Sequence, residues 1–145
     1  MSSGTSLTLA GDVSGTASGP TLTTTLASVG TAGTYVSVVT DVHGRVISGK
    51  PWQRGTASAA TYTVNALDSY VGVTYAAGAA TVTIPAGSAE GRSLLIKDET
   101  GNAFVNNITV NASGTDKIDG AASTLINVNY ETINLMYSAS SWWIV

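Results

Sequence analysis

The chain has 145 residues, of which 10% are charged and 43% hydrophobic, with a formal net charge of −3 and no cysteine. This length allows one domain or a small domain with an extension, and the apolar content excludes a disordered polar tail. The absence of a Lys/Arg cluster argues against nucleic acid as a partner, and the absence of cysteine excludes disulfides and thiolate metal sites.

The N-terminal residues contain few large side chains. Leu7 and Leu9 alternate with Thr8, which is typical of a short half-buried strand, and residues 21–26 form a second candidate strand. Glycines and Pro20 interrupt the chain between these two runs. Such a segment cannot bury enough apolar surface to offset its own ordering entropy. It is therefore either a flexible leader or a segment completed by neighbouring chains.

Residues 34–49, TYVSVVTDVHGRVISG, predict a β-hairpin. Asp41 and Gly44 are the first and fourth residues of the central DVHG, which is the pattern of a type I turn followed by a glycine with positive φ. In this register Asp41 faces Arg45 across the strands. Both faces of the hairpin are partly apolar and require cover; one face carries Val39 and Ile47, and the other carries Val36, Val38 and Val46.

The order of motifs in residues 7–50 is distinctive. It runs from G-D-V-S-G through T-T-T-L and G-T-Y to a V-x-D-x-x-G-R-V hairpin. In this order the motifs resemble a segment of bacteriophage tail-fibre proteins. The resemblance implies a homotrimeric fibre of the virion, made in the host cytoplasm, that joins other tail proteins. It also implies attachment to the host bacterium through a cell-surface glycan or an outer-membrane protein.

Residues 50–56, KPWQRGT, indicate a junction, because Pro51 interrupts strand pairing and Gly55 gives the backbone freedom. Trp52 could pin this junction against the next module. We therefore expect two parts: a shaft-like N-terminal segment with the hairpin over residues 1–55, and a C-terminal head domain over residues 56–145.

From residue 57 onward, short alternating runs recur at the spacing of strands and turns. No window of eleven or more residues keeps a helical period. The residues expected to share one side of each run are Tyr62 and Val64; Val71 and Val73; Val82 and Ile84; Leu94 and Ile96; Ile108 and Val110; Ile126, Val128 and Tyr130; and Ile133, Leu135 and Tyr137. The fold prediction is all-β: a C-terminal antiparallel β-sandwich head preceded by an extended strand-and-hairpin shaft, intertwined in a homotrimer.

The last 49 residues also resemble tail-fibre material, in which an I-T-V run, an I-D-G turn and a final strand with Trp recur in that order. Trp142 and Trp143 should point to opposite sides of that final strand. One is expected in the core. The other is expected at a subunit interface or in solvent, where it could stack on a sugar.

The residues that carry chemistry are few. His43, the only histidine, lies in a predicted turn and lacks the partners of a catalytic triad or a zinc site. The main acids of the head fall in turn-like contexts rather than as a facing pair; Asp116 and Asp119 could help to bind calcium, although their spacing is not that of an EF-hand. The glycines of residues 10–19 lack the Lys of a P-loop.

We therefore predict no enzymatic activity, no cofactor and no metal site. We also predict no membrane insertion, since no run reaches the length of a membrane span.

The longest stretches of the head without alternation are residues 98–107 and 112–123, which are rich in Asn, Asp, Gly, Ser and Thr. Such residues form turns and also supply donors and acceptors that can read a sugar or peptide. The predicted receptor contacts are Asn102, Asn106, Asn107, Asp116 and Lys117. The predicted structural residues are Asp41, Gly44, Arg45, Trp142 and Trp143.

Three other functions are compatible with parts of this pattern. The first is a purely structural trimerisation or fibre-tip module without receptor binding. The second is a polysaccharide depolymerase of the tailspike kind, which is disfavoured because it would need a long β-helix with clustered acids, and this chain has neither. The third is a bacterial surface adhesin domain, which the N-terminal sequence does not favour because it lacks a secretion signal.

Overall fold

The computed structural model describes residues 7–9, 13–17, 21, 23–26, 30, 32–35 and 37–145. The chain divides into two compact units, Met1–Gly49 and Lys50–Val145. Throughout the described ranges the regular elements are strands, without a helix, so the all-β prediction is confirmed. Accordingly, no helix in these ranges is long and apolar enough to cross a membrane.

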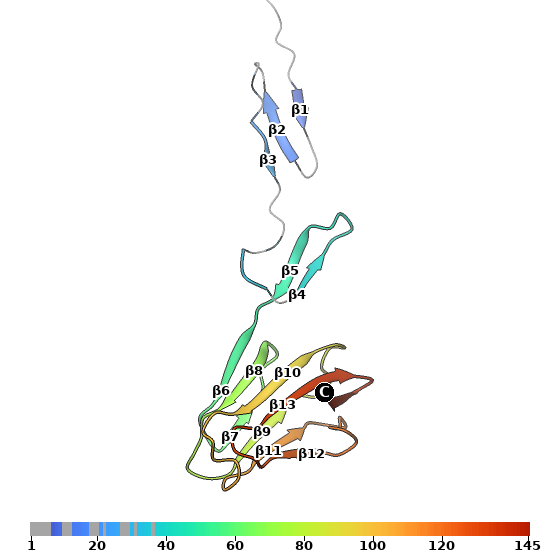
Figure 1. Ribbon diagram of the computed structural model, residues 1–145. Coiled ribbons are helices and arrows are strands. Elements are labelled where there is room, and N and C mark those ends of the chain that lie inside the picture. The colour runs from blue at the N-terminus through green and yellow to red at the C-terminus, as the bar shows by residue number, and fades with distance from the viewer. Residues whose placement is uncertain are drawn as a thin grey trace, which may run out of the picture. The chain divides into compact units, whose positions relative to one another are not determined.

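The first unit begins with a three-stranded antiparallel sheet of β1 (Leu7–Leu9), β2 (Val13–Ala17) and β3 (Thr25–Leu26), with β2 in the centre (Figure 1). Strand β1 was expected. Strand β2 was not, because its sequence offers no alternation of large apolar side chains; pairing on both sides holds it instead. Strand β3 covers only the end of the expected 21–26 run, and Leu22 lies outside the described residues.

The second sheet of this unit is the predicted hairpin, formed by β4 (Ser37–Thr40) and β5 (Val46–Lys50). The amide of Gly44 donates to the Asp41 carbonyl (3.0 Å), and Gly44 has a φ of +79°. The Asp41 amide donates to the Arg45 carbonyl (2.9 Å), and Arg45 Nε donates to Asp41 Oδ2 (2.7 Å). This is the turn geometry expected from the sequence. Val36 lies outside the described residues, but Val38, Val39 and Ile47 are exposed, so the hairpin leaves apolar surface uncovered.

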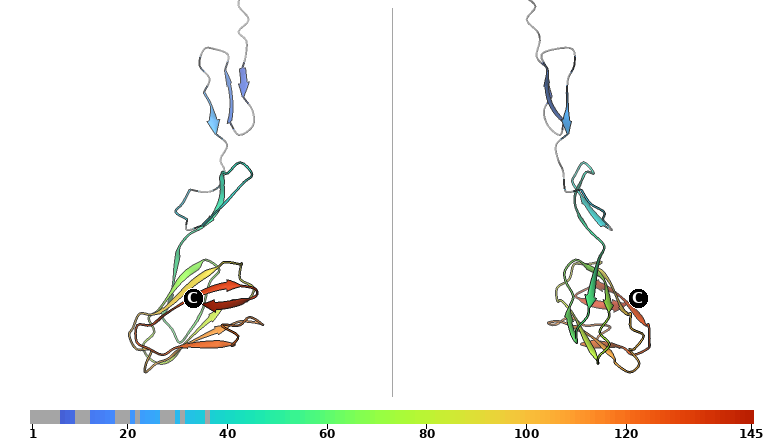
Figure 2. Two further views of the ribbon diagram at one scale, coloured as in Figure 1. Left: turned by 45° about the vertical axis from the view of Figure 1, so that its right-hand side comes forward. Right: turned by 90° about the vertical axis from the view of Figure 1, so that its left-hand side faces the viewer.

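The second unit contains two sheets, shown in Figures 1 and 2. The five-stranded sheet has the order β14-β13-β10-β8-β6, and the four-stranded sheet has the order β12-β11-β9-β7. The bounds are β6 Gln53–Ala57, β7 Thr61–Thr63, β8 Asp68–Val73, β9 Ala80–Ile84, β10 Ser93–Asp98, β11 Ile108–Ala112, β12 Ser123–Ile126, β13 Thr132–Ser138 and β14 Ser141–Ile144.

The chain passes back and forth between these two sheets from β6 to β11. Consequently β6, β8 and β10 pair in parallel in one sheet, and β7, β9 and β11 pair in parallel in the other. Parallel neighbours require a crossover connection, and here each crossover contains a strand of the opposite sheet. The prediction of an antiparallel head is therefore wrong for the pairing among these six strands. It holds for the pairs β10–β13, β11–β12 and β13–β14, which are antiparallel.

Two further expectations need correction. The boundary between the units lies after Gly49 and not after residue 55, because β6 is hydrogen-bonded into the five-stranded sheet of the second unit. The expected run through Val128 and Tyr130 ends at Ile126. There the Glu131 carboxylate accepts from the amides of Asn127 and Val128 (both 3.2 Å) and turns the chain away.

The inward residues of both sheets form one buried core. They include Val71, Val82, Leu94, Ile96, Val110, Ile126, Leu135 and Trp142. The Trp142 ring is fully buried and meets the Tyr137 ring edge to face, with 5.1 Å between centroids. Trp143 points to the other side of the last strand and is 46% exposed. The alternation of the last strand therefore places one tryptophan in the core and one at the surface.

The connections of the second unit gather at two opposite ends of its strands. One end, the first edge, consists of residues 58–60, 74–79, 99–107 and 127–131, and lies on the left of the unit in Figure 1. The other, the second edge, consists of residues 64–67, 85–92, 113–122 and 139–140.

Candidate functional site

The first edge is organised by Asp98, the last residue of β10, whose side chain points inward and is fully buried. Its Oδ1 accepts hydrogen bonds from the amides of Thr100 (2.9 Å) and Gly101 (3.1 Å) and from the Thr100 hydroxyl (2.7 Å). Its Oδ2 accepts from the amides of Ala103 (3.1 Å) and Tyr130 (3.0 Å). One carboxylate thus joins the 99–107 connection to the 127–131 connection.

The charge of Asp98 is maintained by these contacts. Burial alone would raise the pKa of this carboxyl, but the hydrogen bonds from Thr100, Tyr130 and Ala103 outweigh burial and lower the pKa to about 2. Asp98 is therefore ionised at neutral pH, and its charge-assisted hydrogen bonds are stronger than neutral ones. The two connections are held by a buried anion rather than by a hydrophobic core of their own.

Above this anchor the first edge exposes four large apolar or aromatic side chains. Phe104 is 75% exposed, Val105 74%, Tyr130 63% and Val128 57%. The Phe104 amide donates to Asn129 Oδ1 (2.9 Å), which joins the two connections a second time. We call these four residues the apolar platform. Large apolar side chains exposed on two connections that are hydrogen-bonded to each other make this edge a candidate interaction site.

Tyr130 is held in an unusual conformation. Its φ is +61°, in the left-handed region that residues with a side chain rarely adopt. Its ring covers Gly101 so closely that a Cβ on that glycine would lie 2.2 Å from the Tyr130 Cζ. The Lys97 ammonium donates to the Tyr130 carbonyl and lies 6.0 Å from the ring centroid. These contacts fix the position of an exposed aromatic ring.

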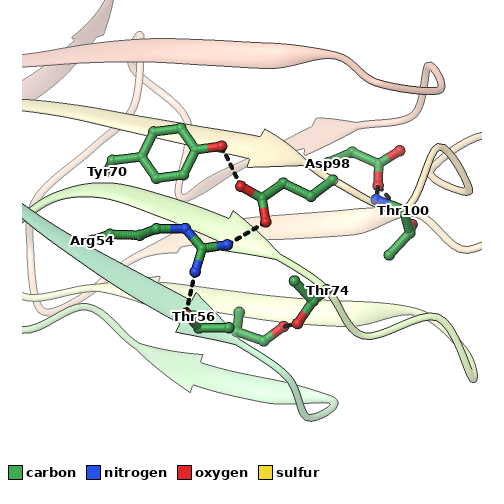
Figure 3. Close-up of polar contacts among 8 residues, drawn as sticks. Arg54, Thr56, Tyr70, Thr74, Asp98 and Thr100 are labelled. Carbon is green, nitrogen blue, oxygen red and sulfur yellow. Dashed lines mark hydrogen bonds and ion pairs between the residues drawn. The ribbon is translucent and has the colours of Figure 1, made fainter.

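Glu99 follows Asp98 and points to the outer face of the five-stranded sheet. The Tyr70 hydroxyl donates to Glu99 Oε1 (2.6 Å), and the Arg54 guanidinium pairs with Oε2; Figure 3 draws these two contacts as dashed lines from the labelled Tyr70 and Arg54 to one unlabelled carboxylate. Burial and the hydrogen bond to Glu99 raise the pKa of Tyr70 to about 12. Both neighbouring acids, Asp98 and Glu99, are therefore engaged in structural hydrogen bonds.

The predicted contacts Asn102, Asn106 and Asn107 lie on this edge but are partly buried. The side-chain amides of Asn102 and Asn106 both donate to the Ala76 carbonyl (3.4 and 3.1 Å), and the Asn107 carbonyl accepts from the Ala80 amide (3.1 Å). These residues hold the 99–107 connection against its neighbour, residues 74–79. They support the platform from below.

The other two predicted contacts, Asp116 and Lys117, lie on the second edge. Asp116 is buried and accepts from the Gly87 amide (3.1 Å); burial and a hydrogen bond to Asp116 raise the pKa of Tyr137. The Lys117 side chain is exposed, and its carbonyl accepts from the Trp142 amide (2.7 Å). The structure therefore separates the five predicted contacts between two opposite edges instead of combining them in one site.

Sequence reasoning missed the residues that the first edge exposes. Polar loop residues are the usual candidates for recognition, which favours the asparagines over Phe104 and Val105, and the alternation of Ile126, Val128 and Tyr130 indicates a strand. A signal was present: two consecutive large apolar residues occur inside a loop of Asn, Gly and Ala. Apolar residues at turn positions, where no sheet can bury them, could have identified the platform.

Among the described residues, no group of three or more His, Cys, Asp or Glu side chains is placed to hold a metal ion. The two acids considered for calcium act as separate acceptors: Asp116 for the Gly87 amide, and Asp119 Oδ1 for the Ile144 amide (3.1 Å).

Comparison of the chain with known protein families and with curated protein sequences gave no match.

Proposed function

We propose that this chain is the distal, receptor-binding part of a bacteriophage tail fibre, and that the apolar platform contacts the surface of the host bacterium. The observation that carries the proposal is the set of four exposed side chains on two connections clamped by one buried carboxylate. Loops that carry recognition are held by a rigid β scaffold. Aromatic side chains supply large contact area at low conformational cost.

The remaining elements of the proposal concern assembly. The chain forms a homotrimer in the virion, joins other tail proteins, and presents the second unit as a β-sandwich head. Exposed Val38, Val39 and Ile47 on a two-stranded hairpin support association, because two strands alone do not bury enough surface to be stable. The same observation supports the alternative function, a structural trimerisation or fibre-tip module in which recognition is performed by another protein.

The proposed activity is adhesion without catalysis. The acids of the first edge are committed to other groups: Asp98 to backbone amides, Glu99 to Arg54 and Tyr70, and Glu131 to the amides of Asn127 and Val128. A hydrolytic acid/base pair needs carboxyl groups that can exchange protons with a substrate. The receptor is a glycan or an outer-membrane protein of the host surface.

Adsorption of purified protein to host cells tests this function. The double variant Phe104→Ser and Tyr130→Ser should bind at least tenfold more weakly, because it removes two aromatic contacts of the platform. Lys117→Ala is the matched control on the second edge and should bind as the wild type does. Equal adsorption by all three proteins would favour the structural alternative. Loss of binding by the control alone would place recognition on the second edge.

A further inference from the structure

In the four-stranded sheet, the outer face of β7, β9 and β11 carries a regular array of small polar side chains, and on β12 its two rows continue with Leu125 and Ser123. In the first row Thr61 is opposite Thr81, and Thr81 is opposite Thr109. In the second row Thr63 is opposite Thr83, and Thr83 is opposite Asn111. We call these six residues the threonine face. The alternation is strict, since Val82 and Val110 between the rows are fully buried on the inner side.

The threonine face differs from the outer face of the other sheet. None of its six residues is charged, whereas the outer face of the five-stranded sheet carries Arg54, Lys97 and Glu99, bound to one another or to neighbouring groups. Strands in a sheet lie about 4.7–4.9 Å apart, and side chains on one face repeat every second residue. The parallel, in-register pairing of β7, β9 and β11 therefore produces an even, uncharged surface.

We propose that this threonine face is where copies of the second unit meet around the axis of the assembled protein. The inference rests on the proposed homotrimer and identifies the surface that forms it. Residues near a symmetry axis approach their own copies, so a charged residue there meets a like charge. A hydroxyl is both donor and acceptor, and an amide carries both kinds of group, so Thr and Asn can pair with themselves.

The methyl groups of the threonines also favour contact between copies, because their burial removes apolar surface from water. The chain carries a net charge of −3, so contact through an uncharged face avoids repulsion that other orientations of the copies would meet. Assembly through this face also leaves the first edge, with its apolar platform, free at the side of the threefold axis.

The natural chain contains no cysteine, which allows a direct test with single introduced thiols. Thr81→Cys, Thr83→Cys and Thr109→Cys place one thiol near the centre of the threonine face. Thr132→Cys is the control: it is an exposed strand position of the other sheet, opposite Lys97. Each full-length variant is treated with a short bis-maleimide at low micromolar concentration and analysed on a denaturing gel, with the native mass measured in parallel by light scattering.

The wild type should have about three times the chain mass of 14.6 kDa. At least one central variant should convert about two thirds of its chains to a linked pair, because one thiol per chain can join only two of three copies. The control should remain largely unlinked. A trimer whose three central variants link no better than the control would overturn the inference while leaving the trimer intact. A monomeric wild type would overturn both the homotrimer and the contact through the threonine face. The adsorption experiment tests adhesion separately.

Discussion

The two edges of the second unit are built from the same kind of connection but expose different surfaces. The first edge presents Phe104, Val105, Val128 and Tyr130 to solvent over the buried Asp98. The second edge also contains a buried acid, Asp116, but the large side chains that it exposes are mixed: Leu67, Lys117 and Asp119. A buried carboxylate that accepts backbone hydrogen bonds is thus a common way to shape a connection, and what the connection exposes distinguishes a candidate contact surface from an ordinary turn.

The largest expected effect is on stability, from removal of the anchor of the first edge. Asp98→Ala leaves the amides of Gly101, Ala103 and Tyr130 without their acceptor and should lower the free energy of unfolding by roughly 3–5 kcal/mol. Asp116→Ala, its counterpart on the second edge, removes the acceptor of the Gly87 amide and of the Tyr137 hydroxyl and should cost less, roughly 2 kcal/mol. Urea denaturation of both variants measures the difference. Equal losses would show that Asp98 has no special role.

The stability that Asp98 provides should depend on pH. The folded pKa of Asp98 is about 2, below the ordinary value of 3.8, so its contribution to stability is present above pH 4 and is lost as the pH falls towards 2. The loss should be roughly 2 kcal/mol. Asp98→Asn should lack this part of the pH dependence, although it is less stable at neutral pH. An unchanged acid profile in that variant would contradict the assigned role.

Two glycine variants with smaller expected effects should distinguish the contribution of the Tyr130 ring to adsorption from the cost of backbone strain. Gly101→Ala and Gly87→Ala both place a side chain at positive φ, +69° and +65°, but only at Gly101 does the new Cβ meet the Tyr130 ring. Both should lose about 1–2 kcal/mol of stability from backbone strain. Gly101→Ala should also displace the ring and weaken adsorption, whereas Gly87→Ala should not. Identical adsorption would show that the position of the ring is unimportant.

The smallest effect is expected at Lys117. Its side chain is exposed, so Lys117→Ala should change the free energy of unfolding by less than about 0.5 kcal/mol. Thermal melting measures this change. A large loss would indicate that the side chain supports the neighbouring Trp142 strand in a way that its backbone contact alone does not reveal.

The sequence was informative where a local rule determines the structure. Asp41 and Gly44 specify their turn through hydrogen bonding and positive φ. Strict alternation identified buried residues such as Leu94, Ile96 and Leu135. These features depend on neighbours along the chain, and their physical causes are therefore visible in a single sequence.

Pairing between strands was not predictable in the same way. An alternating strand has the same pattern whether its neighbour runs parallel or antiparallel, so the crossovers from β6 to β11 left no local signal. The roles of Asp98 and Tyr130 depend on contacts between residues 32 positions apart. The lack of alternation in residues 98–107 and 112–123 marks both stretches as connections, but it does not reveal which side chains they expose.

The central claim, that the first edge meets the receptor, can be tested by blocking each edge with the same chemical group. Val105→Cys and Lys117→Cys each place one thiol at an exposed position of a chain that otherwise has none. Each variant is labelled with a polyethylene glycol maleimide, and its adsorption to host cells is compared with that of the unlabelled variant. The account predicts that the label abolishes adsorption at position 105 and leaves it unchanged at position 117. Adsorption that survives the label at position 105 would contradict the account.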